Sequence, residues 1–274
     1  MTVIGAMFFA SSAANTLAQP PAAAPAPVAG SATSTAIVPP PTREHFHIYL
    51  LMGQSNMVGR DTRSLASQID NPHILALNHD NQWVVARDPI HYDMQKPAGQ
   101  GPGISFAVEM LKAEPGVTIG LVPCAVGGTP LSRWVKGGDL YEACIARAEI
   151  AAQAGPIAGM LWHQGEADTE DPQLANTYEK RLTQMFRDLR TDLNTPDLPI
   201  VVGQLGPFLD PVKYPYLKRV RSALEGIPTD LLHVAYADSV GLTDRGDQLH
   251  FSADSQKIFG VRYAKAMRGL GARD

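Results

Sequence analysis

From about residue 43 onward, short apolar runs alternate with segments of helical periodicity, and this alternation constrains the fold more than any other feature. The connections between the runs are too long for hairpins, so most neighbouring strands must be joined by crossovers. This pattern predicts an α/β domain with a mostly parallel sheet covered by helices on both faces. The predicted strands span residues 48–52, 116–124, 157–162, 199–205 and 232–237, and the predicted helices span residues 103–114, 140–154, 171–189, 212–224 and 252–267.

The stretch between Gly59 and Gly101 is the least regular part of this domain. It is rich in Asp, Asn, Pro and His, and it is long for a connection inside a compact domain. Long irregular insertions are often functional, and we expect this one to form one wall of a substrate cleft.

Residues 1–42 differ sharply from the remainder of the chain. The first 18 residues mix small and apolar side chains as a secretory signal does, and residues 19–41 are almost all Pro, Ala, Gly, Ser, Thr and Val. We expect a cleaved signal-like segment and a Pro/Ala-rich linker, hence a secreted or periplasmic protein, although no Lys or Arg precedes Arg43. The apolar part is too short for a membrane span, and residues 43–274 are predicted to form the folded domain.

Charge and cysteine content exclude several classes of function. The net charge of -4 and the pI near 6.1 provide no basic surface for nucleic acid or an anionic membrane. Cys124 and Cys144 are the only cysteines and lack metal-ligand spacing. Either they form one disulfide or they are two buried thiols.

The first candidate catalytic residue is Ser55. It lies two residues beyond Gly53, where the apolar run from Ile48 to Met52 ends. The carboxyl ends of parallel strands are where open α/β sheets bind ligands, and a serine there can act as a nucleophile if a base accepts its proton. A serine in this position can instead simply cap the next helix.

Two further motifs follow predicted strands. Gly127 and Gly128 come soon after the strand that ends at Cys124, and paired glycines let backbone N–H groups approach a developing oxyanion. The segment His163-Gln164-Gly165-Glu166 follows the next strand and places an amide donor and a carboxylate at the same edge. Taken singly, each segment is equally compatible with an ordinary turn or a solvated loop.

The last motif is Asp247-x-x-His250, just before the closing helix. In a tight turn, Asp247 can accept a hydrogen bond from one imidazole nitrogen while the other nitrogen faces Ser55. That is the arrangement of a Ser-His-Asp catalytic triad, with acid and base on one loop.

Together these motifs resemble those of SGNH-type hydrolases, in the branch of carbohydrate acetylesterases that includes acetyl xylan esterases of carbohydrate esterase family 6 and sialate O-acetylesterase-like proteins. The resemblance runs from about Phe46 to Tyr263 and rests on four segments in order: Gly53-Gln54-Ser55-Asn56, Gly127-Gly128, His163-Gln164-Gly165-Glu166 and Asp247-x-x-His250. It implies a three-layer α/β/α, flavodoxin-like fold with about five strands, and no metal or organic cofactor.

The resemblance also implies a role for each site residue. Ser55 would be the nucleophile and His250 the general base, and the oxyanion donors would be the Ser55 N–H, Gly127 or Gly128, and the Gln164 side chain. Either Asp247 or Glu166 could orient His250, and we favour Asp247 because it lies on the same short turn. We expect the substrate cleft to be lined by Gln54, Asn56, Trp134 and His163.

The implied substrate is an O-acetylated carbohydrate, most simply acetylated xylan or a related plant polysaccharide. O-acetylated sialic acid is an alternative substrate. A different class also remains open, in which the chain is a carbohydrate-binding protein that has lost the chemistry but kept the fold. The intact set of Ser55, Asp247 and His250 argues against that class.

Overall fold

The computed structural model describes residue 1 and residues 36–65, 68, 70–92 and 96–271. The predicted signal segment and nearly all of the predicted linker lie outside the described residues. The last part of that linker is described, and there Ile37 forms an isolated antiparallel bridge with Val84. The N–H of Val38 also donates to the carbonyl of Trp83 at 2.9 Å, so contacts with the domain begin before Arg43.

The described residues form one seven-stranded sheet in the order β3-β2-β4-β1-β5-β6-β7. Every neighbouring pair is parallel except β2 and β3, as a mostly parallel α/β fold requires. The strands are β1 (Phe46–Gly53), β2 (Ile74–Leu77), β3 (Trp83–Val85), β4 (Thr118–Pro123), β5 (Ile157–His163), β6 (Ile200–Gly203) and β7 (Val234–Ala237).

The sheet has more strands than the five that the sequence predicts. The two additional strands, β2 and β3, lie within the irregular stretch between Gly59 and Gly101. They contain four and three residues, which is too short for a periodic pattern to stand out from a loop. They are nevertheless held firmly, because β2 pairs with β4 on one side and β3 on the other.

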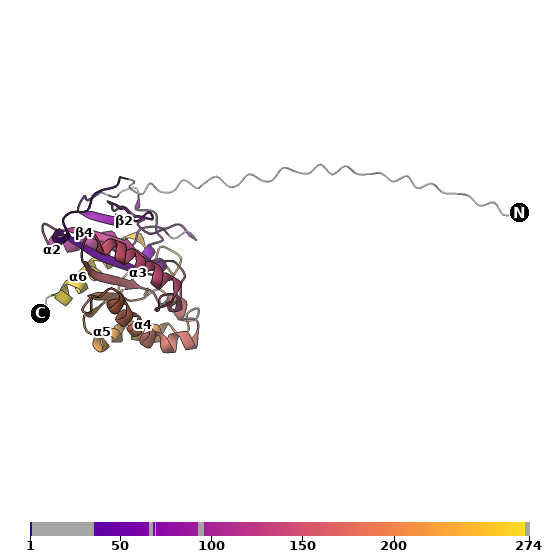
Figure 1. Cartoon of the computed structure of the whole chain (residues 1–274). Coiled ribbons are helices and arrows are strands. Elements are labelled where there is room, and N and C mark those ends of the chain that lie inside the picture. The colour runs from indigo at the N-terminus through magenta and orange to yellow at the C-terminus, as the bar shows by residue number, and fades with distance from the viewer. Residues whose placement is uncertain (2–35, 66–67, 69, 93–95, 272–274) are drawn as a thin grey trace. The chain divides into compact units, whose positions relative to one another are not determined.

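Helices cover both faces of the sheet (Figure 1). The described α-helices are α1 (Ser55–Val58), α2 (Gly103–Ala113), α3 (Asp139–Ala152), α4 (Pro172–Asp192), α5 (Leu217–Asp230) and α6 (Ala253–Gly271). Helix α4 begins as predicted, because Asp171 caps it by accepting the N–H groups of Gln173 and Leu174. Helix α5 begins later than predicted, at Leu217, because residues 210–214 form a turn in which the N–H of Tyr214 donates to the carbonyl of Asp210 at 2.9 Å.

The core consists of two apolar layers separated by the sheet. Alternate residues of β1 point to opposite faces, so Ile48 and Leu50 pack with helices α3, α4 and α5, whereas Tyr49 and Leu51 pack with α2 and α6. All four side chains are buried. Burial on both faces explains why β1 is a continuous apolar run rather than an alternating one.

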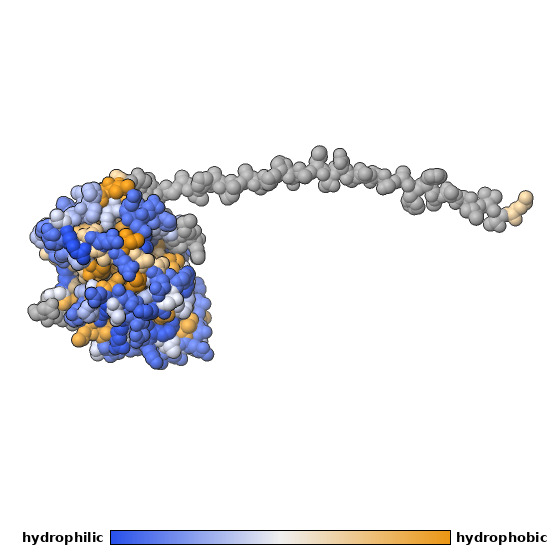
Figure 2. Space-filling model, viewed as in Figure 1, coloured by the Kyte–Doolittle hydropathy of each residue, from blue (hydrophilic) through white to orange (hydrophobic). Residues whose placement is uncertain are grey.

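The outer surface is mainly polar on the face shown in Figure 2, with apolar residues in small groups between polar ones. Among the described residues, no helix combines the length and the apolar character needed to span a bilayer.

The topology brings three loops to one edge of the sheet. Strand β1 lies between β4 and β5, so the segments that follow these strands must meet at their carboxyl ends. The loop between β7 and α6 returns to the same place through a turn in which Asp244 bridges Phe251.

Candidate active site

Ser55 is the first residue of α1 and follows a sharp turn at the end of β1. Gly53 makes this turn with φ of 130°, and a Cβ at that position would lie 2.1 Å from the carbonyl oxygen of His163. Only glycine fits there, because the turn presses against β5. The N–H of Gln54 donates to that same carbonyl at 2.8 Å, which fixes the backbone just before Ser55.

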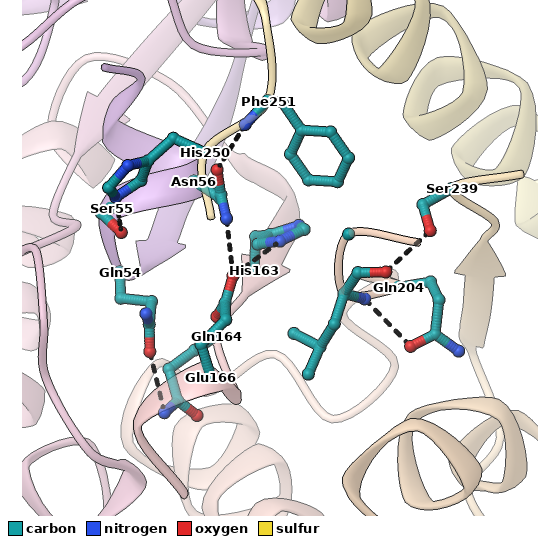
Figure 3. Close-up of polar contacts among 12 residues, drawn as sticks. Gln54, Ser55, Asn56, His163, Gln164, Glu166, Gln204, Ser239, His250 and Phe251 are labelled. Carbon is teal, nitrogen blue, oxygen red and sulfur yellow. Dashed lines mark hydrogen bonds and ion pairs between the residues drawn. The ribbon is translucent and has the colours of Figure 1, made fainter. Parts of the chain in front are cut away.

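The structure brings Ser55, His250 and Asp247 together. His250 Nε2 lies 3.1 Å from Ser55 Oγ, and His250 Nδ1 lies 2.8 Å from Asp247 Oδ2 (Figure 3 shows the serine contact). The other oxygen of Asp247 accepts the backbone N–H groups of His250 and Leu249 at 2.8 and 3.1 Å. These contacts have the geometry expected of a nucleophile, a base and an orienting acid.

Burial lowers the pKa of the His250 imidazole below its ordinary value. The nearby Arg60 guanidinium acts in the same direction, whereas Asp247 and Glu166 oppose the shift. Burial also opposes ionisation of Asp247, but its hydrogen bonds with His250 outweigh burial, and its pKa is lowered. An uncharged His250 beside an ionised Asp247 is the state that can accept a proton from Ser55.

Glu166 does not contact His250 Nδ1, the nitrogen that an orienting acid must hold; that atom contacts Asp247. Its Oε1 accepts a hydrogen bond from Asn56 Nδ2 at 2.6 Å and lies 3.7 Å from His163 Nε2. Burial opposes ionisation of Glu166, yet the contacts with His163 and Asn56 leave its pKa lowered. Of the two candidate acids, the geometry therefore favours Asp247.

Gln164 is completely buried, and its amide group is committed to other protein groups. Its Nε2 donates to Asp168 Oδ2 at 2.7 Å and to the carbonyl of Thr129 at 3.1 Å, while its Oε1 accepts from the Tyr178 hydroxyl at 3.0 Å. The expectation that Gln164 donates to an oxyanion is not met by this geometry, because an amide nitrogen has only two hydrogens.

Gln54 lies next to Gln164. Its Oε1 is 3.3 Å from Gln164 Nε2 (Figure 3), so the two hydrogens of Nε2 face three protein acceptors, on Gln54, Asp168 and Thr129. Gln54 also lines the cavity beside Ser55.

The glycine loop after β4 borders the cavity and follows directly on a disulfide-bonded cysteine. Gly127 and Gly128 line the cavity, and Gly128 has φ of 71°, a conformation that favours glycine. Just before the loop, Cys124 forms a disulfide with Cys144 of α3, with their Cα atoms 5.5 Å apart. Of the two alternatives that the sequence left open, the structure has the disulfide.

A cavity of about 280 Å³ borders Ser55 and His250. Three residues expected in its lining are absent from it. Trp134 is completely buried and donates its indole N–H to Thr129 Oγ1 at 3.0 Å, and His163 is buried against Phe251 and Phe259. Asn56 is also buried, and its Nδ2 donates to Glu166 Oε1 rather than facing the cavity.

The residue types of the other lining residues do not by themselves mark them as cavity residues. Besides the residues named above, the described lining comprises Arg60, Lys96, Ala167, Glu170, Tyr214 and Leu249. Arg60 and Lys96 belong to the irregular stretch that the sequence predicts to form a cleft wall, and they do border the cavity.

With this geometry in place, comparison with known proteins is informative. Residues 45–269 match the family described as carbohydrate esterase, sialic acid-specific acetylesterase. This chain belongs to that family. It is a carboxylic ester hydrolase, and the resemblance stated from its motifs is confirmed.

Individual relatives agree with this assignment. A probable carbohydrate esterase of Arabidopsis thaliana is 35% identical over 241 residues, which cover 80% of this chain and 89% of that protein. The crystal structure of that same Arabidopsis protein has a TM-score of 0.75 at 33% identity and covers 84% of this chain and 99% of that one. NanS has a TM-score of 0.69 at 18% identity, with 85% and 99% of the two chains covered, and supports the fold.

Proposed function

We propose that this esterase removes O-acetyl groups from carbohydrates through a Ser-His-Asp mechanism and an acetyl-enzyme. The observation that carries this proposal is the chain of contacts from Ser55 Oγ to His250 to Asp247 at the edge of a cavity. Ser55 attacks the acetyl carbonyl while His250 takes its proton, and His250 then returns the proton to the departing sugar hydroxyl. Water, activated by His250, hydrolyses the acetyl-enzyme.

The oxyanion donors in this proposal are the N–H of Ser55, an N–H of Gly127 or Gly128, and the side-chain amide of Gln54. Gln54 takes the place that the sequence assigned to Gln164. Because the amide oxygen of Gln54 faces Gln164 Nε2 at 3.3 Å, the nitrogen end of Gln54 is left to donate toward the cavity.

A small acyl group fits this cavity best. Its volume is about 280 Å³, and most of the described lining residues are polar or charged. A fatty acyl chain would require a long apolar surface, whereas an acetyl group and part of a sugar need only a few well-placed polar contacts.

Acetylated xylan or a related plant polysaccharide is the substrate we propose. The 35% identical relative, described as a probable carbohydrate esterase, supports a carbohydrate ester as the substrate class. The description of the matching family favours O-acetylated sialic acid as a second candidate.

The decisive experiment measures acetate release from acetylated xylan and from O-acetylated sialic acid, with the wild type beside Ser55→Ala. Release from xylan that disappears in the variant would support the proposal, and release only from the sialic acid would favour the second candidate. Sugar binding without acetate release from either substrate, or from short synthetic esters, would contradict the proposed chemistry.

We also propose that the protein is exported. Its disulfide between Cys124 and Cys144 supports this, since disulfides persist mainly in oxidising compartments. Export would be tested by locating the protein in fractionated cells of its native host and sequencing the mature amino terminus.

A further inference from the structure

Asn56, the residue after Ser55, is hydrogen-bonded through its side chain to the backbone on both sides of His250. Its Oδ1 accepts the N–H of Phe251 at 3.1 Å, and its Nδ2 donates to the carbonyl of Leu249 at 3.1 Å (Figure 3 shows the contact with Phe251). One amide group thus binds the two neighbours of His250, nearly 200 residues away in the sequence. With 1% of its surface exposed, Asn56 lies outside the cavity lining.

Glu166 fixes which way this amide points. It accepts the remaining Asn56 Nδ2 hydrogen at 2.6 Å, and an ionised carboxylate can only accept. The nitrogen of Asn56 must therefore face Glu166 and Leu249, which leaves the oxygen for Phe251. Burial makes a reversed amide costly, because it would leave the carboxylate facing an oxygen.

Glu166 lies beside a buried histidine. His163 Nε2 is 3.7 Å from Glu166 Oε1, beyond hydrogen-bond distance, and His163 Nδ1 lies 3.0 Å from the hydroxyl of Tyr263. That hydroxyl donates to the carbonyl of Trp162 at 3.0 Å, so it accepts from His163. The hydrogen bonds that reach the His250 loop therefore run from Glu166 through Asn56.

We propose that Asn56 is a positioning residue, which holds the His250 loop in register with Ser55 and is itself oriented by Glu166. This inference rests on the proposed function, because it assigns a second set of residues to the same catalytic geometry. Asn56 acts through backbone contacts and touches neither substrate nor the reacting atoms.

The His250 loop needs such support because no strand carries it. Its residue Gln248 has φ of 55°, and the side chain of Asp247 is 32% exposed. Backbone that is exposed and outside the sheet ladder opens more readily than a buried strand. A displacement of about 1 Å at a catalytic group can cost on the order of 10²-fold in rate, so a contact that restrains the loop affects turnover directly.

Loss of the restraint should also change the titration of the base. The charged groups that face His250 are Asp247 on its own loop, Glu166 from the segment after β5, and Arg60 from the segment after α1. Burial is the largest influence and lowers the pKa of His250. A looser loop admits water, so the pKa should rise toward its ordinary value.

The test compares Asn56→Ala with the wild type and with a matched control, Gln204→Ala. The Gln204 amide is also buried and hydrogen-bonded at both ends, because its Oε1 accepts the N–H of Leu205 at 2.9 Å and its Nε2 donates to Glu225 Oε1 at 2.8 Å (Figure 3 shows the contact with Leu205). Gln204 lies between β6 and α5, outside the loop that carries His250. Kinetics on 4-nitrophenyl acetate, the pH profile of kcat/KM, the melting temperature and the downfield proton resonance of the His250–Asp247 pair are measured for each protein.

We expect Asn56→Ala to lower kcat by about 10- to 100-fold with KM changed less than about twofold, since the lost contact serves orientation rather than binding. The acidic limb of its pH profile should move to higher pH, and the downfield resonance should broaden or vanish. Gln204→Ala should lower the melting temperature without these changes. If Asn56→Ala does not fold, Asn56→Ser supplies the same comparison with a smaller loss of volume.

The inference is overturned if a folded Asn56 variant keeps kcat, the pH profile and the downfield resonance of the wild type. It is also overturned if Gln204→Ala produces the same kinetic and spectral changes, because the effect would then be general destabilisation. Failure of the proposed function gives a different result. In that case the wild type hydrolyses no ester, while the resonance still reports whether Asn56 restrains the loop.

Discussion

The two halves of the candidate site are built in different ways. Ser55, Gly127 and Glu166 follow three neighbouring central strands, β1, β4 and β5, whose residues are almost entirely buried. His250 and Asp247 lie on a loop that follows edge strand β7 and is held by one isolated bridge, between Asp244 and Phe251, and by side-chain hydrogen bonds. The Ser55 side is therefore positioned by the sheet, whereas the His250 side depends on particular polar contacts.

The largest expected effect tests whether the halves work as one unit. Ser55→Ala and His250→Ala should each lower kcat by about 10⁴-fold or more, because either change removes the activated nucleophile. The double variant should be no slower than the single ones, since residues that act together are not additive. Steady-state kinetics on a short acetyl ester measures this. Multiplied effects in the double variant would show that the two halves act independently.

A somewhat smaller loss of activity distinguishes Asp247 from Glu166 as the acid that orients His250. Asp247→Asn should lower kcat by about 10³-fold, because the amide cannot hold the imidazole in the tautomer that accepts the serine proton. Glu166→Gln should cost far less, since a glutamine can still accept the hydrogen bond from Asn56. Kinetics of the two variants decides the assignment, and a larger loss in Glu166→Gln would reverse it.

The two glutamines on the nucleophile side provide the next comparison. Gln54→Ala should lower kcat by about 10²-fold if its amide donates to the oxyanion. Gln164→Ala should reduce both activity and melting temperature, because it removes the residue that bonds Asp168, Thr129 and Tyr178 as well as Gln54. Combined kinetics and thermal unfolding distinguish them. A kinetic loss confined to Gln164→Ala, without destabilisation, would return the donor role to Gln164.

The smallest expected effect is on pH dependence. The base must be uncharged to accept the serine proton, and burial lowers the pKa of His250 below its ordinary value. Activity should therefore persist below pH 6.5, the ordinary value, before it falls as His250 becomes protonated. A pH profile of kcat/KM measures the midpoint of this fall. A midpoint above the ordinary histidine value would show that Asp247 outweighs burial.

Sequence reasoning succeeded where a pattern is local. The buried run of β1, the cap at Asp171 and the spacing of Asp247 and His250 each lie within a few residues, and each predicted feature is present. It failed where a pattern is too short or depends on distant contacts. Strands β2 and β3 have too few residues for periodicity, and Trp134 lies in the core although it was expected in a loop at the cleft.

The sequence by itself determined the α/β class, the order of the motifs and the candidate nucleophile and base, because periodicity and short spacing record them directly. Only the tertiary structure decided which acid holds His250, which glutamine reaches the cavity, and that Asn56 binds both neighbours of His250. The physical reason is that hydrogen-bond partners for these polar side chains are chosen in space, across separations of up to 195 residues, where no sequence period extends.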